Sequence, residues 1–222
     1  MKKNVTVFLV DDHAVVREGY KHLLEKANIL VIAEAASGEE ACQHYERIQP
    51  DIVVIDLSMP GIGGLEAIRR LITKDKNAKV LAFSMHDDTI FATRAMQAGA
   101  SGYITKSNAP NVLVEAVFAI SNGKKFISQD IANKISQQQI AFGEITSSGQ
   151  PKNEDLLAEL SPREFEVFQL LAKGLSLDEI ANILHLDYKT IANTQTRLRQ
   201  KLKVENAAQL ILAAVKLNIL AN

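Results

Sequence analysis

IVVIDLSMPGIGG, residues 52–64, is the stretch of this sequence that decides the fold. Its first four residues are apolar and β-branched, which predicts a strand buried on both faces of a parallel sheet. The strand delivers one carboxylate, Asp56, and the chain then breaks at Pro60 and Gly61. A charged residue at the carboxyl end of such a strand lies where open α/β sheets bind their ligands. Asp56 is therefore the first candidate for a functional group.

The bulk composition is that of a globular protein. The chain has 222 residues, of which 47% are hydrophobic and 23% charged, enough for one large domain or two ordinary ones. Its longest apolar run, residues 210–215, is too short to span a bilayer, so we expect no membrane association. Asp11 and Asp12 interrupt the N-terminal apolar run, which a signal peptide would not tolerate. The single cysteine excludes an internal disulfide, and we expect a cytoplasmic protein.

Charge is divided unevenly along the chain. Residues 1–130 hold 15 basic and 16 acidic residues (net −1), residues 131–159 hold 2 and 4 (net −2), and residues 160–222 hold 8 and 6 (net +2). Only the C-terminal piece is positive, which permits a polyanionic partner without requiring one.

Short apolar runs alternate with helical patterns over residues 1–125. The runs that predict strands are residues 5–10, 30–33, 52–55, 80–83 and 103–104. This alternation predicts an α/β domain, with a doubly wound, five-stranded parallel sheet covered by helices on both faces. In the first helix we expect one buried apolar face, made of Val15, Val16, Tyr20, Leu23 and Leu24.

The remaining chain has a different character. Residues 126–156 are rich in glutamine and turn formers, which predicts a linker that is partly helical near its start. Residues 157–222 have a wholly helical pattern, which predicts an all-α domain of four helices. Ser161 and Ser176 are expected to cap the first two helices. The second helix and the longer third one, joined by a tight turn, have the helix-turn-helix pattern.

Four strand ends of the predicted sheet carry groups suited to phosphoryl transfer. Asp11 and Asp12 follow the first strand, and Asp56, Ser84 and Lys106 follow the third, fourth and fifth. These ends share one edge of a parallel sheet, so the side chains are expected to converge. Clustered carboxylates suit Mg²⁺, a lysine neutralises phosphoryl charge, and one carboxylate can form an acyl phosphate. Any one of these residues alone is more often a cap or a turn residue; their joint occurrence favours a site.

Residues 5–120 resemble the receiver domain of two-component response regulators. The matching residues are Asp11, Asp12, Asp56 in IDLSMPGIGG, Ser84, Tyr103 in SGYITK, and Lys106. The resemblance implies a flavodoxin-like fold and a partner histidine kinase that phosphorylates Asp56. Many receivers have proline after the lysine, whereas this chain has Ser107, so the geometry of that peptide bond is left open.

The same resemblance implies roles for the residues around Asp56. Asp12 and Asp56 would bind Mg²⁺ directly, Asp11 would assist, and Ser58 would supply its backbone carbonyl. Lys106 would assist the transfer of the phosphoryl group. Ser84 and Tyr103 would form a switch that moves when Asp56 is phosphorylated.

The C-terminal piece contains the strings LSPREFEVFQLLAKGLS (160–176), EIANILHL (179–186), KTI (189–191) and RLRQKLKV (197–204). Through these, residues 160–220 resemble the LuxR-type helix-turn-helix, with residues 189–202 as the recognition helix. Side chains expected to face the major groove are Ala192, Asn193, Thr196, Arg197 and Gln200. The other expected DNA contacts, which would lie mainly at phosphates, are Lys189, Thr190, Arg199, Lys201 and Lys203. Many family members have a lysine in place of Ala192 and a histidine in place of Thr194. The last helix resembles a dimerisation helix, with Leu210, Ile211, Ala214 and Val215 on its apolar face.

Together the resemblances predict a response regulator of the NarL/FixJ type, and not an enzyme. The strings SMPGIGGLEA and MQAGA are most similar to the GacA/UvrY-type regulators. Phosphorylation would promote dimerisation and binding to double-stranded promoter DNA. The alternative, suggested by Ala192 and Thr194, is an interaction protein whose output domain binds a protein partner. An aspartyl-phosphate hydrolase is disfavoured, because no second carboxylate is placed as its general acid.

Overall fold

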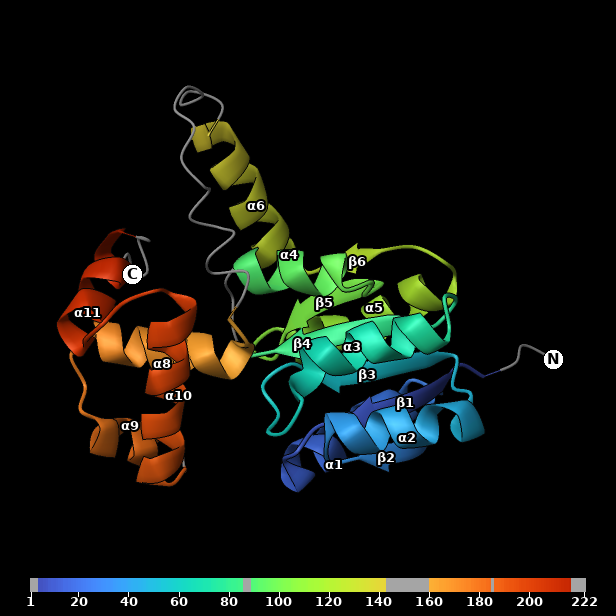
Figure 1. Ribbon diagram of the computed structural model, residues 1–222. Helices are drawn as coiled ribbons and strands as arrows, with labels where there is room; N and C mark the ends of the chain where they lie inside the picture. The colour runs from blue at the N-terminus through green and yellow to red at the C-terminus, as the bar shows by residue number, and fades with distance from the viewer. Residues whose placement is uncertain (1–3, 86–88, 143–159, 185, 217–222) are drawn as a thin grey trace. The chain divides into compact units, whose positions relative to one another are not determined.

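A computed structural model describes residues 4–85, 89–142, 160–184 and 186–216 (Figure 1). The chain divides into two compact units, Met1–Ser148 and Gly149–Asn222. Among the residues described, no helix combines the length and the apolar character needed to cross a membrane.

The first unit is built on a parallel sheet with the strand order β2-β1-β3-β4-β5-β6. The strands are β1 (Thr6–Val10), β2 (Leu30–Ala35), β3 (Ile52–Asp56), β4 (Val80–Ser84), β5 (Gly102–Thr105) and β6 (Phe126–Ile127). Every residue of β3 and β4 is buried, as expected for central parallel strands. The chain runs from β1 to one side for β2 and to the other for β3, so the sheet switches direction at β1 and β3. Ligands of open α/β sheets bind outside the carboxyl ends at such a point.

Helices cover both faces of this sheet, which confirms the predicted doubly wound fold (Figure 1). One face packs against α1 (Ala14–Lys26) and α5 (Ala109–Ser121). The other packs against α2 (Gly38–Ile48), α3 (Gly63–Lys74) and α4 (Thr89–Gln97). The buried face predicted for α1 is correct for Leu24, which has no exposed surface, but wrong for Val15, which is 87% exposed. Val15 precedes Leu24 by nine residues, about two and a half helical turns, and so points to the opposite side.

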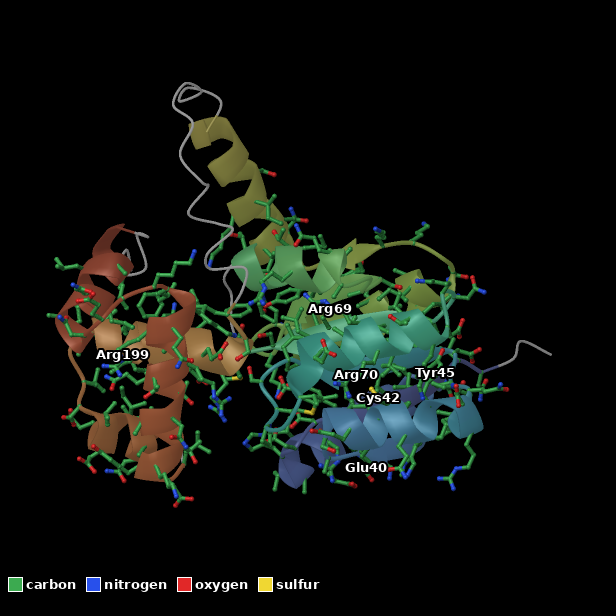
Figure 2. The ribbon with its side chains drawn as sticks, in the orientation of Figure 1. Glu40, Cys42, Tyr45, Arg69, Arg70 and Arg199 are labelled. Atoms are coloured by element: carbon green, nitrogen blue, oxygen red, sulfur yellow. The ribbon has the colours of Figure 1, made fainter. Side chains whose placement is uncertain are left out.

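Helices α2 and α3 pack side by side through specific contacts. Cys42 and Tyr45 line the side of α2 that faces α3 (Figure 2). The Cys42 thiol donates to the Ala67 carbonyl at 3.8 Å, and the Tyr45 hydroxyl donates to Asp75 Oδ2 at 2.8 Å. Burial raises the pKa of the Cys42 thiol, so this cysteine serves as a packed core residue.

The segment after α5 continues the sheet. β6 adds a sixth parallel strand that the sequence analysis did not anticipate, because a strand of two residues has no detectable period. It is followed by α6 (Gln129–Phe142), which packs against α4 and extends away from the sheet (Figure 1). The helical start predicted for this segment is thus present as a helix of 14 residues.

The second unit contains the four predicted helices. They are α8 (Pro162–Ala172), α9 (Leu177–Ile183), α10 (Tyr188–Lys201) and α11 (Ala207–Lys216). Ser161 and Ser176 each complete a capping box, with Glu164 and Glu179 as the reciprocal partners. The fully buried residues Phe165, Phe168, Ile180, Ile191 and Leu198 join α8, α9 and α10 into one core.

Candidate functional site

The predicted carboxylates and lysine converge at the switch point of the sheet. Asp11 follows β1 and Asp56 ends β3, and these strands are hydrogen-bonded neighbours. Lys106 follows β5 and extends across β4, so that its Nζ lies 2.6 Å from Asp11 Oδ2 and 2.8 Å from Asp56 Oδ2. The exposed fractions of these side chains are 7% for Lys106 and 1% for each carboxylate. The structure therefore forms a buried ion triad at this edge.

Backbone amides fix both carboxylates of the triad. The His13 amide donates to Asp11 Oδ1 at 2.8 Å, and the Ser58 amide donates to Asp56 Oδ1 at 3.0 Å. The Lys106 amide donates to the Ser84 carbonyl at 2.6 Å, and the Lys106–Ser107 peptide is trans. In each carboxylate, one oxygen thus accepts a hydrogen bond from a backbone amide, and the other contacts the Lys106 ammonium.

Opposing effects set the protonation of the triad. Burial raises the pKa of Asp56, and neither Lys106 nor the Ser58 amide fully offsets it. Burial alone would lower the pKa of Lys106, but the neighbouring carboxylates of Asp56 and Asp11 outweigh it, so this pKa is raised. The lysine is therefore a permanent cation, and it is shared by two carboxylates.

The donor set fits a small divalent cation. Ligand atoms of Asp11, Asp12, His13 and Asp56 all lie within 4.8 Å of one another. With three carboxylates ionised and one ammonium, the cluster has a net charge of −2. Asp12 Oδ1 is buried and accepts no hydrogen bond, although His13 Nδ1 lies 2.9 Å away. Oxygen ligands with an excess of negative charge are what Mg²⁺ prefers, whereas the imidazole of His13 suits softer metals.

The predicted switch residues lie on β4 and β5, the two strands that follow β3 in the sheet. Ser84 ends β4 and Tyr103 lies in β5, and both side chains are fully buried. Ser84 is paired in register with Thr105, the residue before Lys106. The Lys106 amide also donates to the Ser84 carbonyl, so the end of β4 is joined directly to the residue that carries the ammonium.

Two aromatic residues of the site were missed by the sequence analysis. Lys106 Nζ lies 5.6 Å from the centroid of the Phe83 ring, within the range of a cation–π contact. The Tyr20 ring packs edge-on against Phe83, with centroids 4.6 Å apart. Phe83 looks like an ordinary core residue in an apolar strand, so only the fold identifies it as the wall along which the lysine lies.

Close packing also fixes the loop after Asp56. The Leu57 amide donates to the Phe83 carbonyl at 2.9 Å. A side chain at Gly64 would overlap the carbonyl oxygen of Asp56. The glycine lets the start of α3 approach the backbone of the acceptor residue closely.

The third helix of the second unit presents a polar face. Its exposed residues include six of the predicted DNA contacts: Lys189, Thr190, Asn193, Thr196, Arg197 and Gln200. Ile191, Leu198 and Leu202 are buried, as predicted from their spacing. Thr194 is only 7% exposed, and its hydroxyl donates to the Thr190 carbonyl at 2.9 Å. Thr194 therefore belongs to the core side of the helix, and its identity removes no group from the exposed face.

Two of the predicted phosphate contacts are engaged within the unit. Lys201 Nζ lies 2.6 Å from Glu164 Oε2, and Arg199 donates to the Glu205 carbonyl at 3.4 Å. Glu164 is buried at the start of α8, so this ion pair ties α8 to the end of α10. Burial would raise the pKa of Glu164, but the Lys201 ammonium and the Ser161 amide hold it below the ordinary value.

Two family models match the sequence in the order of these units. Residues 7–118 match the response regulator receiver domain. Residues 158–214 match the bacterial regulatory proteins of the luxR family. The chain belongs to the response regulators with a luxR-family output domain. This confirms the family predicted from Asp11, Asp12, Asp56, Lys106 and the C-terminal helices.

Similar response regulators match almost the whole chain. UvrY of Escherichia coli K12 is 35% identical over 213 residues, which cover 96% of this chain and 94% of UvrY. The transcriptional activator ExaE of Pseudomonas putida is 38% identical over 215 residues, covering 96% and 97%. The predicted likeness to UvrY-type regulators is therefore confirmed.

Solved response regulators share the fold. One of the LuxR family from Aurantimonas sp. SI85-9A1 is 46% identical, with a TM-score of 0.61, and covers 62% of this chain and 99% of its own. RcsB of Salmonella typhimurium is 25% identical, with a TM-score of 0.57, and covers 96% and 98%. RcsB has also been solved as a complex with DNA.

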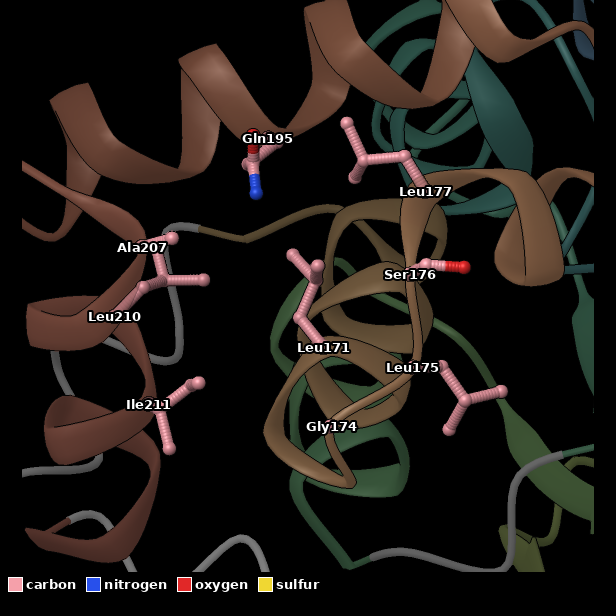
Figure 3. A pocket seen from close by; sticks show the side chains of 9 residues that line it. All are labelled: Leu171, Gly174, Leu175, Ser176, Leu177, Gln195, Ala207, Leu210 and Ile211. Atoms are coloured by element: carbon pink, nitrogen blue, oxygen red, sulfur yellow. The ribbon is translucent and has the colours of Figure 1, made fainter.

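The luxR-family unit of this response regulator has a small open cavity of about 180 Å³, lined by α8, α10, α11 and the connection from α8 to α9 (Figure 3). Figure 3 shows the Gln195 side chain directed toward it, with Leu171 and Leu210 on the walls. Ligand pockets have volumes of roughly 300–1,000 Å³. We interpret the cavity as imperfect helix packing and not as a ligand site.

The Glu164–Lys201 pair predicts acid-sensitive stability of this unit. Glu164→Gln keeps a carbonyl oxygen for the Ser161 amide but loses the ionic partner of Lys201, so we expect a loss of about 1–2 kcal/mol at pH 7. Because the folded pKa of Glu164 lies below its ordinary value of 4.5, its contribution is present above that value and disappears as the pH falls through the folded pKa. Hydrogen exchange of α8 and α10 in the full chain measures it.

Glu166→Gln is the matched control for this prediction. It removes an i,i+3 ion pair with Arg163, in which the side chains of Arg163 and Glu166 are 29% and 27% exposed. Such a pair contributes less than about 0.5 kcal/mol, so little change is expected. Equal effects of the two substitutions, or an effect of Glu164→Gln that does not diminish as the pH falls below 4.5, would contradict the assignment.

Proposed function

We propose that Asp56 accepts a phosphoryl group from a sensor histidine kinase, and that this modification controls DNA binding by the C-terminal unit. The observation that carries the proposal is the buried triad of Asp11, Asp56 and Lys106 at the switch point of the sheet. The proposed organisation is a receiver domain over residues 1–125, a linker over 126–156 and a DNA-binding domain over 157–222.

In the proposed transfer, a carboxylate oxygen of Asp56 attacks the phosphorus of a phosphohistidine. The P–N bond of the donor breaks, an O–P bond forms to Asp56, and the imidazole nitrogen takes up a proton. The product is an acyl phosphate. Its added charge is balanced by Lys106, which already lies 2.8 Å from Asp56. Ser84, at the end of the neighbouring strand, is proposed to donate its hydroxyl to a phosphoryl oxygen, with buried Tyr103 completing the switch.

Mg²⁺ is the proposed cofactor of this transfer. Asp11, Asp12, Asp56 and the Ser58 carbonyl would hold it, since the carboxylates are clustered and carry excess negative charge. When bound, the ion neutralises phosphoryl oxygens and reduces the repulsion between the acceptor and the incoming group.

The exposed face of α10 is proposed to enter the major groove of promoter DNA. Asn193, Thr196 and Arg197 lie at its centre and are exposed, while Ala192 is half-buried among them. RcsB, which has the same fold, binds DNA as a dimer. The remaining proposed contacts, at phosphates, are Lys189, Thr190, Arg199 and Lys201.

Dimerisation is proposed to use the outer face of α11. Leu210 and Ala214, predicted for the dimer face, are buried in the core of their own unit. Among the described residues, the exposed large apolar side chains of this helix are Ile211, also predicted for the dimer face, at 39%, and Leu212, which was not predicted, at 59%. The side chain of Val215, the fourth predicted residue, lies outside the described part of the structure. The alternative of a protein-binding output domain is not favoured, because one of its two grounds was Thr194, which faces the core.

A salt titration tests the DNA-binding proposal. The probe is a duplex selected by the wild-type protein from a random-sequence library, with beryllofluoride and Mg²⁺ present. We expect Lys189→Ala, which removes a proposed phosphate contact, to lower the slope of log affinity against log salt by about 0.9. Asn193→Ala is expected to weaken the selected site by about 1–3 kcal/mol relative to random duplex, if it contacts a base.

Lys125→Ala is the control, because this exposed lysine precedes β6 in the first unit and is not one of the proposed DNA contacts. It should leave both the affinity and the salt slope unchanged. Binding that is independent of salt, or equal binding by wild type and the α10 variants, would overturn the proposal and favour a protein partner.

A further inference from the structure

A chain of hydrogen bonds joins the two residues that flank Lys106 to the helix that follows the sheet. Thr105 is the last residue of β5, is fully buried and immediately precedes Lys106. Its hydroxyl donates to Asp130 Oδ2 at 3.2 Å. The Ser107 hydroxyl, on the other side of Lys106, donates to the Thr105 hydroxyl oxygen at 3.2 Å. The residues on both sides of the lysine are therefore held by one carboxylate from the first turn of α6.

The start of α6 is itself fixed to β5. The Ser128 amide donates to the Tyr103 carbonyl at 3.1 Å, and the Ala132 amide donates to the Ser128 carbonyl at 3.0 Å. Burial would raise the pKa of Asp130, but the neighbouring polar groups of Ser128, the Ile131 amide and the Thr105 hydroxyl outweigh it and lower the pKa. Asp130 is thus an ionised acceptor, and a hydrogen bond to a charged group is stronger than one between neutral groups.

We propose that Asp130 is a positioning residue for Lys106, and that the Thr105–Asp130 hydrogen bond couples the state of Asp56 to α6. This inference rests on the proposed function of Asp56. Lys106 must hold its ammonium between two carboxylates and then accommodate a phosphoryl group. The backbone around it is held by Thr105 and Ser107 as a unit with Asp130. By linkage, a ligand at Asp56 that shifts this backbone must alter the stability of the start of α6 by the same free energy.

The first test measures phosphorylation of the full chain by phosphoramidate with Mg²⁺. Thr105→Val removes the hydroxyl with little change of shape, and Asp130→Ala removes its acceptor. Each is expected to slow the incorporation of phosphate by about tenfold, the effect of one hydrogen bond to a charged acceptor. The double variant should be no slower than either single one, since both remove the same contact. Thr105→Ser and Asp130→Asn, which keep a donor and an acceptor, should restore most of the rate.

Asn133→Ala is the matched control on α6. Its side chain accepts a hydrogen bond from Gln129 on the exposed side of the same helix. It should phosphorylate at the wild-type rate. If Thr105 and Asp130 had a purely structural role, their substitutions would lower stability, but the phosphorylation rates would not follow this pattern. The pattern is equal rates in the two single variants, no further loss in the double variant, and recovery in the conservative variants.

The second test measures hydrogen exchange of residues 129–136 with and without beryllofluoride and Mg²⁺. The exchange rates should change on binding in wild type and in Asn133→Ala, and should not change in Thr105→Val. Equal phosphorylation rates in all variants, or a change of exchange on binding in Thr105→Val as large as that in wild type, would overturn the coupling alone. Failure of the wild-type chain to take up phosphate at Asp56 would overturn the proposed function, and the coupling with it.

Discussion

Asp56→Asn is expected to abolish the incorporation of phosphate from a small phosphodonor in the presence of Mg²⁺. The amide that replaces the carboxylate is not a nucleophile, so no acyl phosphate can form at this position. The fold should survive. Burial raises the pKa of Asp56, which means that the folded state holds the neutral form more readily than the unfolded chain does. A neutral isostere at this place should therefore melt at the wild-type temperature or above it.

Asp75→Asn provides the comparison for this substitution. Asp75 follows α3 near the start of β4, at the opposite edge of the sheet, and accepts a hydrogen bond from Tyr45. The Asp75→Asn substitution should leave the incorporation of phosphate unchanged. Labelling of Asp56→Asn at the wild-type rate would show that another side chain accepts the phosphoryl group. Labelling that resists hydroxylamine would show that the product is not an acyl phosphate.

The convergence of Asp56 and Lys106 was predictable because parallel strands place their carboxyl ends at one edge. The ion pair of Asp11, and not Asp12, with Lys106 was not predictable. Alternation along the chain says only that the two point in different directions; the structure shows that Asp11 is buried against Lys106 while Asp12 is 21% exposed at the rim. Which of two adjacent acids contacts the lysine depends on how the loop after β1 turns.

Contacts between elements that are distant in the sequence could also not be predicted from local sequence patterns. The carboxylate of Glu164 was expected to cap α8, and it does, but its ion pair with Lys201 joins residues 37 positions apart. Thr105 and Asp130 meet only because β6 forms, and two residues of strand carry no period. Periodicity predicts which face of an element is buried. It does not predict which polar groups then meet across the buried faces.

Lys106→Met is expected to slow phosphorylation of Asp56 by about 10²–10³-fold, the usual cost of removing one preorganised charge from a reacting centre. Methionine keeps most of the length of the lysine stem, so packing along Phe83 should persist. The substitution leaves Asp11 and Asp56 buried without a cation. Breaking a buried pair in this way costs about 3–5 kcal/mol of folding free energy.

The net charge of the cluster predicts a second effect of Lys106→Met: phosphorylation slows, but Mg²⁺ binding becomes stronger. Removing Lys106 changes the net charge around Asp56 from −2 to −3 when the carboxylates are ionised. Mg²⁺ should therefore bind Lys106→Met more tightly than wild type and raise its melting temperature by more. The variant would be the better metal site and the poorer phosphoryl acceptor.

That opposition separates an electrostatic role from simple damage to the fold. Lys79→Met serves as the control, because Lys79 lies just before β4 and its Nζ donates to the Ser121 carbonyl, with no carboxylate partner in that bond. It should change neither Mg²⁺ affinity nor phosphorylation. If Lys106→Met lost both the reaction and the metal, the lysine would be a structural support of the loop. Retained phosphorylation with tighter Mg²⁺ binding would mean that the metal alone neutralises the phosphoryl group. Only slower transfer together with stronger metal binding fits a lysine that balances charge in competition with the ion.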